Sequence, residues 1–171
     1  MNSLIYSSTI LSIIFSLCMN QGFNLESKSL TPNADIDERF TPQGLDYNPE
    51  ITWNSSPSNS KSFAFLVEDP DAPRGTWYHW VVKNIPSTVN KISENSNPGE
   101  EIVNSWKLKR YKGPSPPKGQ RHRYFFKLYA LSVERINANN VETFLEQVEK
   151  FKIGESSIMG FYSKDQVNKD F

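Results

Sequence analysis

Cysteine is almost absent from this chain of 171 residues, and its one copy is Cys18. Cys18 lies in an N-terminal segment, residues 1–23, that contains no Asp, Glu, Lys or Arg and includes an apolar run at residues 10–17. That run is shorter than the roughly 20 apolar residues of a membrane span and has the length of a signal-peptide core. We therefore expect a signal peptide over residues 1–22, followed by a secreted or periplasmic domain over residues 23–171. A retained anchor or a disordered leader on a cytoplasmic domain is the alternative.

Net charge and the usual catalytic signatures are also missing. Lys plus Arg and Asp plus Glu number 19 each, so the chain has no long-range field to attract nucleic acid or an anionic membrane. The sequence contains no H-E-x-x-H helix and no G-x-S-x-G elbow, and cleavage of the leader would remove the only thiol. We expect local anion recognition, no disulfide bonds, no cofactor and no enzymatic activity.

The composition that is present predicts a single domain of mainly β structure. Aromatic residues make up 13% of the chain and proline occurs 11 times, which suits short strands joined by rigid turns. Continuous apolar runs predict buried strands at residues 62–67, 77–82 and 124–131, with the first in a central position. A shorter strand is expected at residues 50–53, and the polar stretch 87–97 is expected to be an exposed loop.

One helix is predicted near the C-terminus. Asn140 can cap its N-terminus. Apolar side chains then recur at helical spacing, namely Val141, Phe144, Leu145, Val148 and Phe151. We expect this apolar face to pack on the sheet and the glutamates between these positions to face solvent.

Two aspartates directly follow the first predicted buried strand, in the sequence Asp69-Pro70-Asp71-Ala72-Pro73. Pro70 and Pro73 fix the backbone on either side of Asp71, so both carboxylates are held without helix or sheet hydrogen bonds. Rigid carboxylates at the end of a strand suit a binding site. An Asx-type turn, in which each aspartate caps local amides, explains the same residues.

The sequence has two histidines, His79 and His122, and each lies beside a predicted buried strand. A lone histidine in such a place is more often a satisfied structural group than a ligand contact. Their neighbours favour a functional role.

A proline-stiffened loop runs from Gly113 to Gly119 and leads into His122. Its glycines can adopt positive φ angles and turn backbone amides toward an anion. Tyr124 should point to the same face of the following strand as His122, whereas Arg123 should point to the opposite face. We therefore expect Arg123 to form a structural ion pair. The preceding basic residues either attract anions or form a solvated surface, and they are Lys107, Lys109, Arg110 and Lys112.

Several of these motifs, taken in order, resemble the phosphatidylethanolamine-binding protein family: DPDAP, the His-Trp of TWYHWVVKNIP, and GPSPPKG with HRYFF. The segments FNLES, GLDYNPEITW and IMGFY resemble its compact bacterial and archaeal branch, often called Raf kinase inhibitor-like. The resemblance covers nearly the whole mature chain. It implies a large antiparallel sheet packed against a smaller sheet, few flanking helices and a small pocket at one end. Residues 104–111 are bulkier and more basic than is usual in that branch.

The resemblance implies that the pocket residues are Asp69, His79, His122 and Tyr124. Loop amides around Gly113 would assist them in binding a phosphate-like or carboxylate group. Imidazole and phenol groups donate to anionic oxygens in charge-assisted hydrogen bonds, which are roughly twice as strong as neutral ones. Because Asp69 repels a bare dianion, we expect it to accept a hydrogen bond from a histidine or to bind a ligand ammonium or hydroxyl. Asp71, with Pro70 and Pro73, is expected to support the loop.

The leading hypothesis is a non-enzymatic binding protein whose pocket holds an anionic group on a lipid headgroup, a metabolite or a partner protein. The resemblance also implies a regulatory or inhibitory role toward a kinase or a protease, and export would favour an extracellular or periplasmic target. A metal-dependent hydrolase with Asp69, His79 and His122 as zinc ligands is the first alternative. A protein-interaction module with a vestigial pocket is the second.

Overall fold

The computed structural model describes residues 22–164. The expected signal peptide, with Cys18, lies outside this part of the chain except for Gly22.

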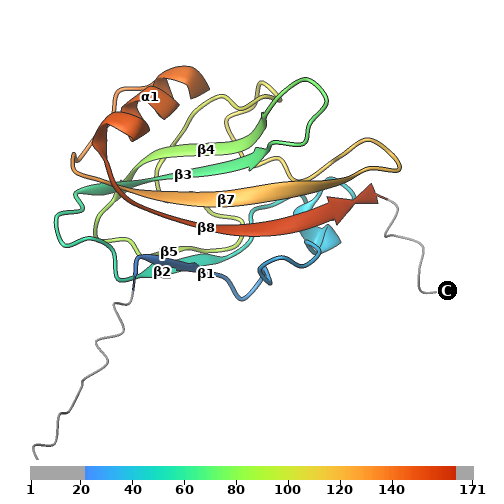
Figure 1. The fold of residues 1–171 in the computed structure, drawn as a ribbon, viewed down its shortest axis with the longest axis horizontal. Helices are drawn as coiled ribbons and strands as arrows, with labels where there is room; N and C mark the ends of the chain where they lie inside the picture. Colours follow the sequence, from blue (N-terminus) through green and yellow to red (C-terminus); the bar gives the residue numbers. More distant parts are fainter. Residues whose placement is uncertain (1–21, 165–171) are drawn as a thin grey trace, which may run out of the picture.

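Two antiparallel sheets form the framework of the protein (Figure 1). The small sheet has the strand order β1-β2-β5, with β1 at Asn24–Glu26, β2 at Ile51–Asn54 and β5 at Lys91–Ile92. The large sheet has the order β6-β4-β3-β7-β8, and its strands are β6 (Glu100–Glu101), β4 (Trp77–Pro86), β3 (Ser62–Asp69), β7 (Arg121–Leu131) and β8 (Lys152–Ser163). The 3-10 helix η1 (Glu38–Phe40) and the α-helix α1 (Val141–Phe151) accompany the sheets. The predicted fold, a large sheet packed against a smaller one with a helix near the C-terminus, is confirmed.

Strand β3 is the middle strand of the large sheet, and both of its faces are covered. On one face Phe65 belongs to the core between the two sheets. On the other face Leu66 packs in a second cluster that includes Phe144 of α1. Figure 1 shows the same three layers, with α1 above the large sheet and the small sheet below it. This double burial is why residues 62–67 are apolar without alternation, as the sequence indicated.

Helix α1 begins where the sequence predicts. The Asn140 side chain accepts a hydrogen bond from the backbone N–H of Thr143 at 2.8 Å, and the Thr143 hydroxyl accepts from the N–H of Asn140 at 3.4 Å. This reciprocal capping satisfies two amides that the first helical turn leaves without partners. Phe144 and Val148 are buried on the face that packs on the sheet.

Four strands lie outside the predicted set, namely β1, β5, β6 and β8. Strand β8 begins directly after α1, and small or polar residues such as Gly154 and Ser156 interrupt its apolar pattern. Strand β5 lies within the stretch 87–97, which was expected to be entirely a loop. Ile92 of β5 is fully buried opposite Ile51 of β2, so that prediction was wrong at this point. Two residues are too few to show a strand periodicity in the sequence.

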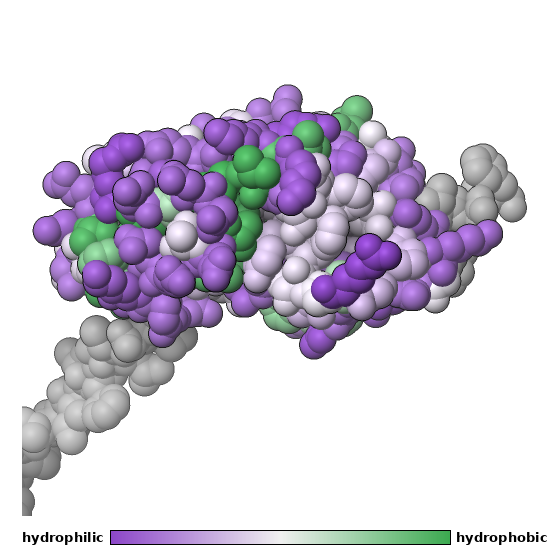
Figure 2. Space-filling view, turned by 90° about the horizontal axis from the view of Figure 1, so that it is seen from above, coloured by the Kyte–Doolittle hydropathy of each residue, from purple (hydrophilic) through white to green (hydrophobic). Residues whose placement is uncertain are grey.

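The surface seen from the side of α1 is mainly hydrophilic, with hydrophobic residues in a narrow band (Figure 2).

No helix within residues 22–164 is long and apolar enough to cross a membrane. Among these residues the large hydrophobic side chains that remain exposed are Leu45 and Trp106.

We predict that Phe65→Ala lowers the free energy of unfolding by about 3–5 kcal/mol, because it leaves a cavity in a rigid core. The Phe65 side chain is fully buried and contacts the edge of Trp80, with ring centroids 5.7 Å apart. Urea unfolding of the two proteins measures the difference. Lys61→Ala, an exposed change next to the same strand, serves as the control and should shift the unfolding midpoint little.

Candidate functional site

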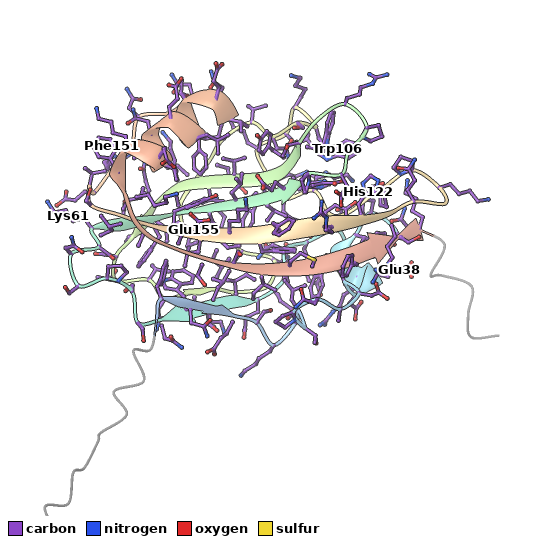
Figure 3. The ribbon with its side chains drawn as sticks, in the orientation of Figure 1. Glu38, Lys61, Trp106, His122, Phe151 and Glu155 are labelled. Atoms are coloured by element: carbon purple, nitrogen blue, oxygen red, sulfur yellow. The ribbon has the colours of Figure 1, made fainter. Side chains whose placement is uncertain are left out.

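A pocket of about 280 Å³ opens at one end of the large sheet. Figure 3 shows Trp106 and His122 at this end, opposite Lys61 and Phe151. Three stretches of chain meet there: the end of β3 with the turn into β4, and two parts of the connection between β6 and β7, one around Trp106 and one around Ser115. The lining residues are Asp69, Ala72, Pro73, Arg74, Trp77, His79, Trp106, Ser115, Pro116, Pro117 and His122.

The strand order brings the polar residues of the pocket together. Strand β3 lies between β4 and β7, so its last residue, Asp69, is a neighbour of both. Asp69 is paired with Trp77 at the start of β4, and His122 is the second residue of β7. Along β7, His122 and Tyr124 are buried whereas Arg123 is exposed, which confirms the predicted alternation.

Asp69 accepts two hydrogen bonds, one for each of its expected roles. Its Oδ1 accepts from the backbone N–H of Asp71 at 2.9 Å, which is the Asx-type turn. Its Oδ2 accepts from Nδ1 of His122 at 2.8 Å, so Asp69 pairs with a histidine as expected. Both side chains are about 5% exposed. This pairing fixes the His122 ring and leaves its Nε2 as the atom that can meet a ligand.

His79 is also fixed through Nδ1, but by the backbone. Its Nδ1–H donates to the carbonyl oxygen of Lys112 at 2.6 Å. The ring lies edge-on to Tyr124, with centroids 5.3 Å apart and an interplanar angle of 81°. Burial lowers the pKa of His79 below its ordinary value of 6.5, although the Lys112 carbonyl and the charge of Asp69 oppose that shift. His79 is therefore neutral at pH 7, and Nε2 is the atom that it offers to the pocket.

Asp71 supports the loop from outside the pocket. Its carboxylate accepts from the Nε and Nη2 atoms of Arg123 at 2.9 and 2.6 Å, and from the Arg123 backbone N–H at 2.9 Å. These hydrogen bonds from Arg123 lower the pKa of Asp71 to about 2. The predicted ion-pair role of Arg123 and the supporting role of Asp71 are thus both seen.

Tyr124 and Gly113 differ from the expectation that they contact a ligand. Tyr124 is fully buried behind His79 and does not line the pocket. Its hydroxyl lies near Asp69 but makes no hydrogen bond of ordinary geometry within residues 22–164, and burial raises its pKa. The Gly113 N–H donates to Oδ1 of Asp46 at 2.8 Å and is not available to an anion. Gly113 is required instead because an added Cβ would lie 2.0 Å from the carbonyl oxygen of Phe40.

Four further residues at the pocket carry no clear signal in the sequence. Arg74 and Ser115 line it, and Trp106 stands at its rim with its ring 6.2 Å from that of His79. Gln120 lies with its Oε1 2.8 Å from Nε2 of His122. The Gln120 amide can present either its oxygen or its nitrogen to the ring, and its exposed side chain can move away when a ligand enters.

The loop that carries Trp106 is held by one buried amide. Asn104 Oδ1 accepts from the backbone N–H groups of Trp106 and Leu108 at 2.9 and 3.0 Å. Its Nδ2 donates to the carbonyl oxygens of His79 and Arg110, both at 2.9 Å. The aromatic rim is therefore tied directly to the strand that carries His79.

The alternative hypothesis places a zinc ion between Asp69, His79 and His122. Within residues 22–164 no group of three or more His, Cys, Asp and Glu residues is arranged to hold a metal ion. The geometry therefore gives no support to that alternative.

Comparisons with known proteins identify the family of this chain. The model of the phosphatidylethanolamine-binding protein family matches residues 26–163. The chain belongs to the phosphatidylethanolamine-binding protein family. A UPF0098 protein of Aquifex aeolicus is 36% identical over 150 residues, which cover 81% of this chain and 87% of the relative. A UPF0098 protein of the archaeon Methanothermobacter thermautotrophicus is 33% identical, with 82% of this chain and 99% of the relative covered.

Solved structures of the family share the fold. A phosphatidylethanolamine-binding protein homolog of Chlamydia trachomatis superposes with a TM-score of 0.79 at 30% identity, covering 85% of this chain and 99% of that one. Escherichia coli YbcL, described as a member of the mammalian family, gives 0.78 at 28% identity, with 82% and 98% covered. The match to bacterial and archaeal relatives confirms the branch that the sequence motifs indicated.

We predict that His79 makes the fold less stable as the pH falls below 6.5. The pKa of His79 is lower in the folded chain than in the unfolded chain, so in that range the unfolded chain binds a proton at His79 more readily. The free energy of unfolding therefore decreases as the pH decreases. Melting temperatures of the wild type and His79→Gln between pH 5.5 and 8 test this. The wild type should lose more stability than the variant toward pH 5.5, and parallel curves would contradict the assignment.

Proposed function

We propose that this protein is a non-enzymatic binding protein whose pocket holds a phosphate-like or carboxylate group. The observation that supports the proposal most is the way both histidines are held. Each lines the pocket and each has its Nδ1 occupied, His79 by the Lys112 carbonyl and His122 by Asp69. Nε2 of His79 therefore remains to meet a ligand, and Nε2 of His122, which now lies 2.8 Å from Gln120 Oε1, can do so when the exposed Gln120 side chain moves away.

The remaining lining suits an anion that carries an organic group. Arg74 is exposed at the pocket and forms no ion pair with the residues between 22 and 164, so its guanidinium is available to an anionic oxygen. Prolines and tryptophans make up much of the wall and offer apolar contact to the rest of the ligand. A phospholipid headgroup or a small phosphorylated metabolite has this combination of features.

Binding rather than turnover fits the chemistry of the lining. Ser115 is the only hydroxyl-bearing residue among those that line the pocket, and no lysine or cysteine is among them. The Asp69–His122 pair resembles the orienting pair of a general base, but the side chains around it offer few nucleophiles to activate.

A regulatory or inhibitory role is the further part of this proposal. A pocket that binds an anionic group on a partner protein, such as a kinase or a protease, would keep that group from its other interactions and thereby inhibit the partner. We also propose that the apolar segment at residues 10–17 directs the protein out of the cytoplasm, so that its target is extracellular or periplasmic.

We predict that the protein binds inorganic phosphate and phosphoethanolamine saturably and that His122→Ala weakens both by about tenfold or more, the effect of losing one charge-assisted hydrogen bond. Calorimetric titration measures both affinities, with Lys61→Ala as a control that leaves the pocket intact. Preferential binding of phosphoethanolamine would indicate a lipid headgroup, and equal binding a free phosphate. Absence of binding by the folded wild type would refute the proposed function and favour a protein-interaction surface.

We also predict that anion affinity rises as the pH falls through the range below 6.5. Neutral His79 has no proton on Nε2 while its Nδ1–H is bound to Lys112, so it must gain a proton before it can donate to an anion. Sulfate is the suitable probe because its charge is constant across this range. His79→Gln should remove much of the pH dependence, and an equally steep dependence in the variant would contradict this role.

A further inference from the structure

Asp46 lies behind the pocket and holds the backbone at Lys112 and Gly113 from two sides. Its Oδ1 accepts from the N–H of Gly113 at 2.8 Å, and its Oδ2 accepts from Nζ of Lys112 at 2.5 Å. The Asp46 side chain is only 16% exposed. A carboxylate with so little exposure to water needs such partners, and both of them come from the loop that leads to β7.

Lys112 is in turn bound to His79 by two hydrogen bonds. Its backbone N–H donates to the carbonyl oxygen of His79 at 3.1 Å, and its own carbonyl accepts from His79 Nδ1 at 2.6 Å. The orientation of the His79 ring therefore depends on where the Lys112 carbonyl is placed. Asp46 sets that placement through Gly113, the next residue along the chain.

Asp46 is itself firmly located. Its φ angle is +55°, a left-handed conformation that Asp tolerates better than most residues do. Its backbone N–H donates to the carbonyl oxygen of Arg39 at 3.1 Å. On the loop side, Gly113 packs against the Phe40 carbonyl so closely that no Cβ fits. The contact between these two segments leaves little room for Lys112 to shift.

We propose that Asp46 is a positioning residue for His79. By holding Lys112 and Gly113, Asp46 keeps the Lys112 carbonyl on Nδ1 and thereby leaves Nε2 of His79 to the pocket. The consequence for ligands rests on the proposed anion-binding function, whereas the consequence for the His79 ring does not.

A comparison of two neutral variants separates this role from a simple charge effect. Asp46→Asn and Asp46→Ala remove the same charge, which also acts on the pKa of His79, so a purely electrostatic account expects both variants to change the His79 ring equally. A positioning role expects a larger change in Asp46→Ala, because Asn still offers an oxygen to the Gly113 N–H.

The test compares Asp46→Asn and Asp46→Ala with Glu50→Gln. Asn keeps an oxygen for the Gly113 N–H and loses the ion pairs with Lys112 and, at 3.8 Å, with Arg110, whereas Ala loses all of these contacts. Glu50 is a matched control, since its carboxylate lies 2.5 Å from Nζ of Lys91, is 18% exposed and does not contact His79 or Lys112. Nitrogen-15 NMR of the histidine rings in the unliganded proteins reports which nitrogen of His79 carries the proton, and calorimetric titration with sulfate reports affinity.

We expect the His79 ring of the wild type to be protonated at Nδ1, with a shift toward a mixture of tautomers in Asp46→Asn and a larger shift in Asp46→Ala. At pH 5.5, where a protonated His79 can donate from Nε2, sulfate affinity should fall by about threefold in Asp46→Asn and about tenfold in Asp46→Ala, as for partial and complete loss of one oriented hydrogen bond. Glu50→Gln should match the wild type in both measurements.

The proposal is overturned if the His79 ring signals of folded Asp46→Asn match those of the wild type, or if sulfate at pH 5.5 binds this variant as tightly as the wild type or more tightly. Asp46→Asn decides the question even if Asp46→Ala does not fold. If the wild type fails to bind sulfate and phosphate, the proposed function fails, but the NMR comparison of the unliganded proteins still decides the positioning role.

Discussion

The hydrogen bond between Oδ2 of Asp69 and Nδ1 of His122, 2.8 Å long, joins the ends of two neighbouring strands in a place with almost no access to water. A carboxylate at such a site is costly unless it is paired, so this contact requires β3 and β7 to keep one register. A slip of one residue would turn His122 toward solvent and bring Arg123 into the pocket. The geometry of the pocket thus depends on the same pairing that builds the centre of the sheet.

Backbone groups, rather than counter-ions, satisfy most of the polar atoms around this pair. The Lys112 carbonyl binds His79, and the Asp71 amide binds Asp69. The Asn104 side chain links the His79 carbonyl to the loop at the rim. Hydrogen bonds of this kind hold each ring in one orientation without neutralising the pocket, so the site is organised before a ligand arrives.

The two aspartates of the DPDAP turn have different roles, one in the interior of the domain and one on its surface. Asp69 is buried and orients His122, whereas Asp71 pairs with Arg123 on the surface and ties the turn to β7. The proline on either side of Asp71 limits the ways in which the chain can connect these two positions. A short rigid turn therefore places one carboxylate in the pocket and the other on the scaffold.

The sequence by itself determined the buried strands, the C-terminal helix and the two histidines with Asp69. Apolar runs, helical spacing and a family motif are local properties that can be read along the chain. Strand β8 was not predicted because its apolar residues are interrupted. Ligand contacts were expected from the sequence for Tyr124 and Gly113; the complete burial of Tyr124 and the bond of Gly113 to Asp46 could not be predicted because each depends on a distant partner. Only the tertiary structure decided those partners. Asp46 and Gly113 are 67 positions apart, and Asp69 and His122 are 53 apart, so which polar groups satisfy one another follows from the packing of the two sheets and has no signature in the local sequence.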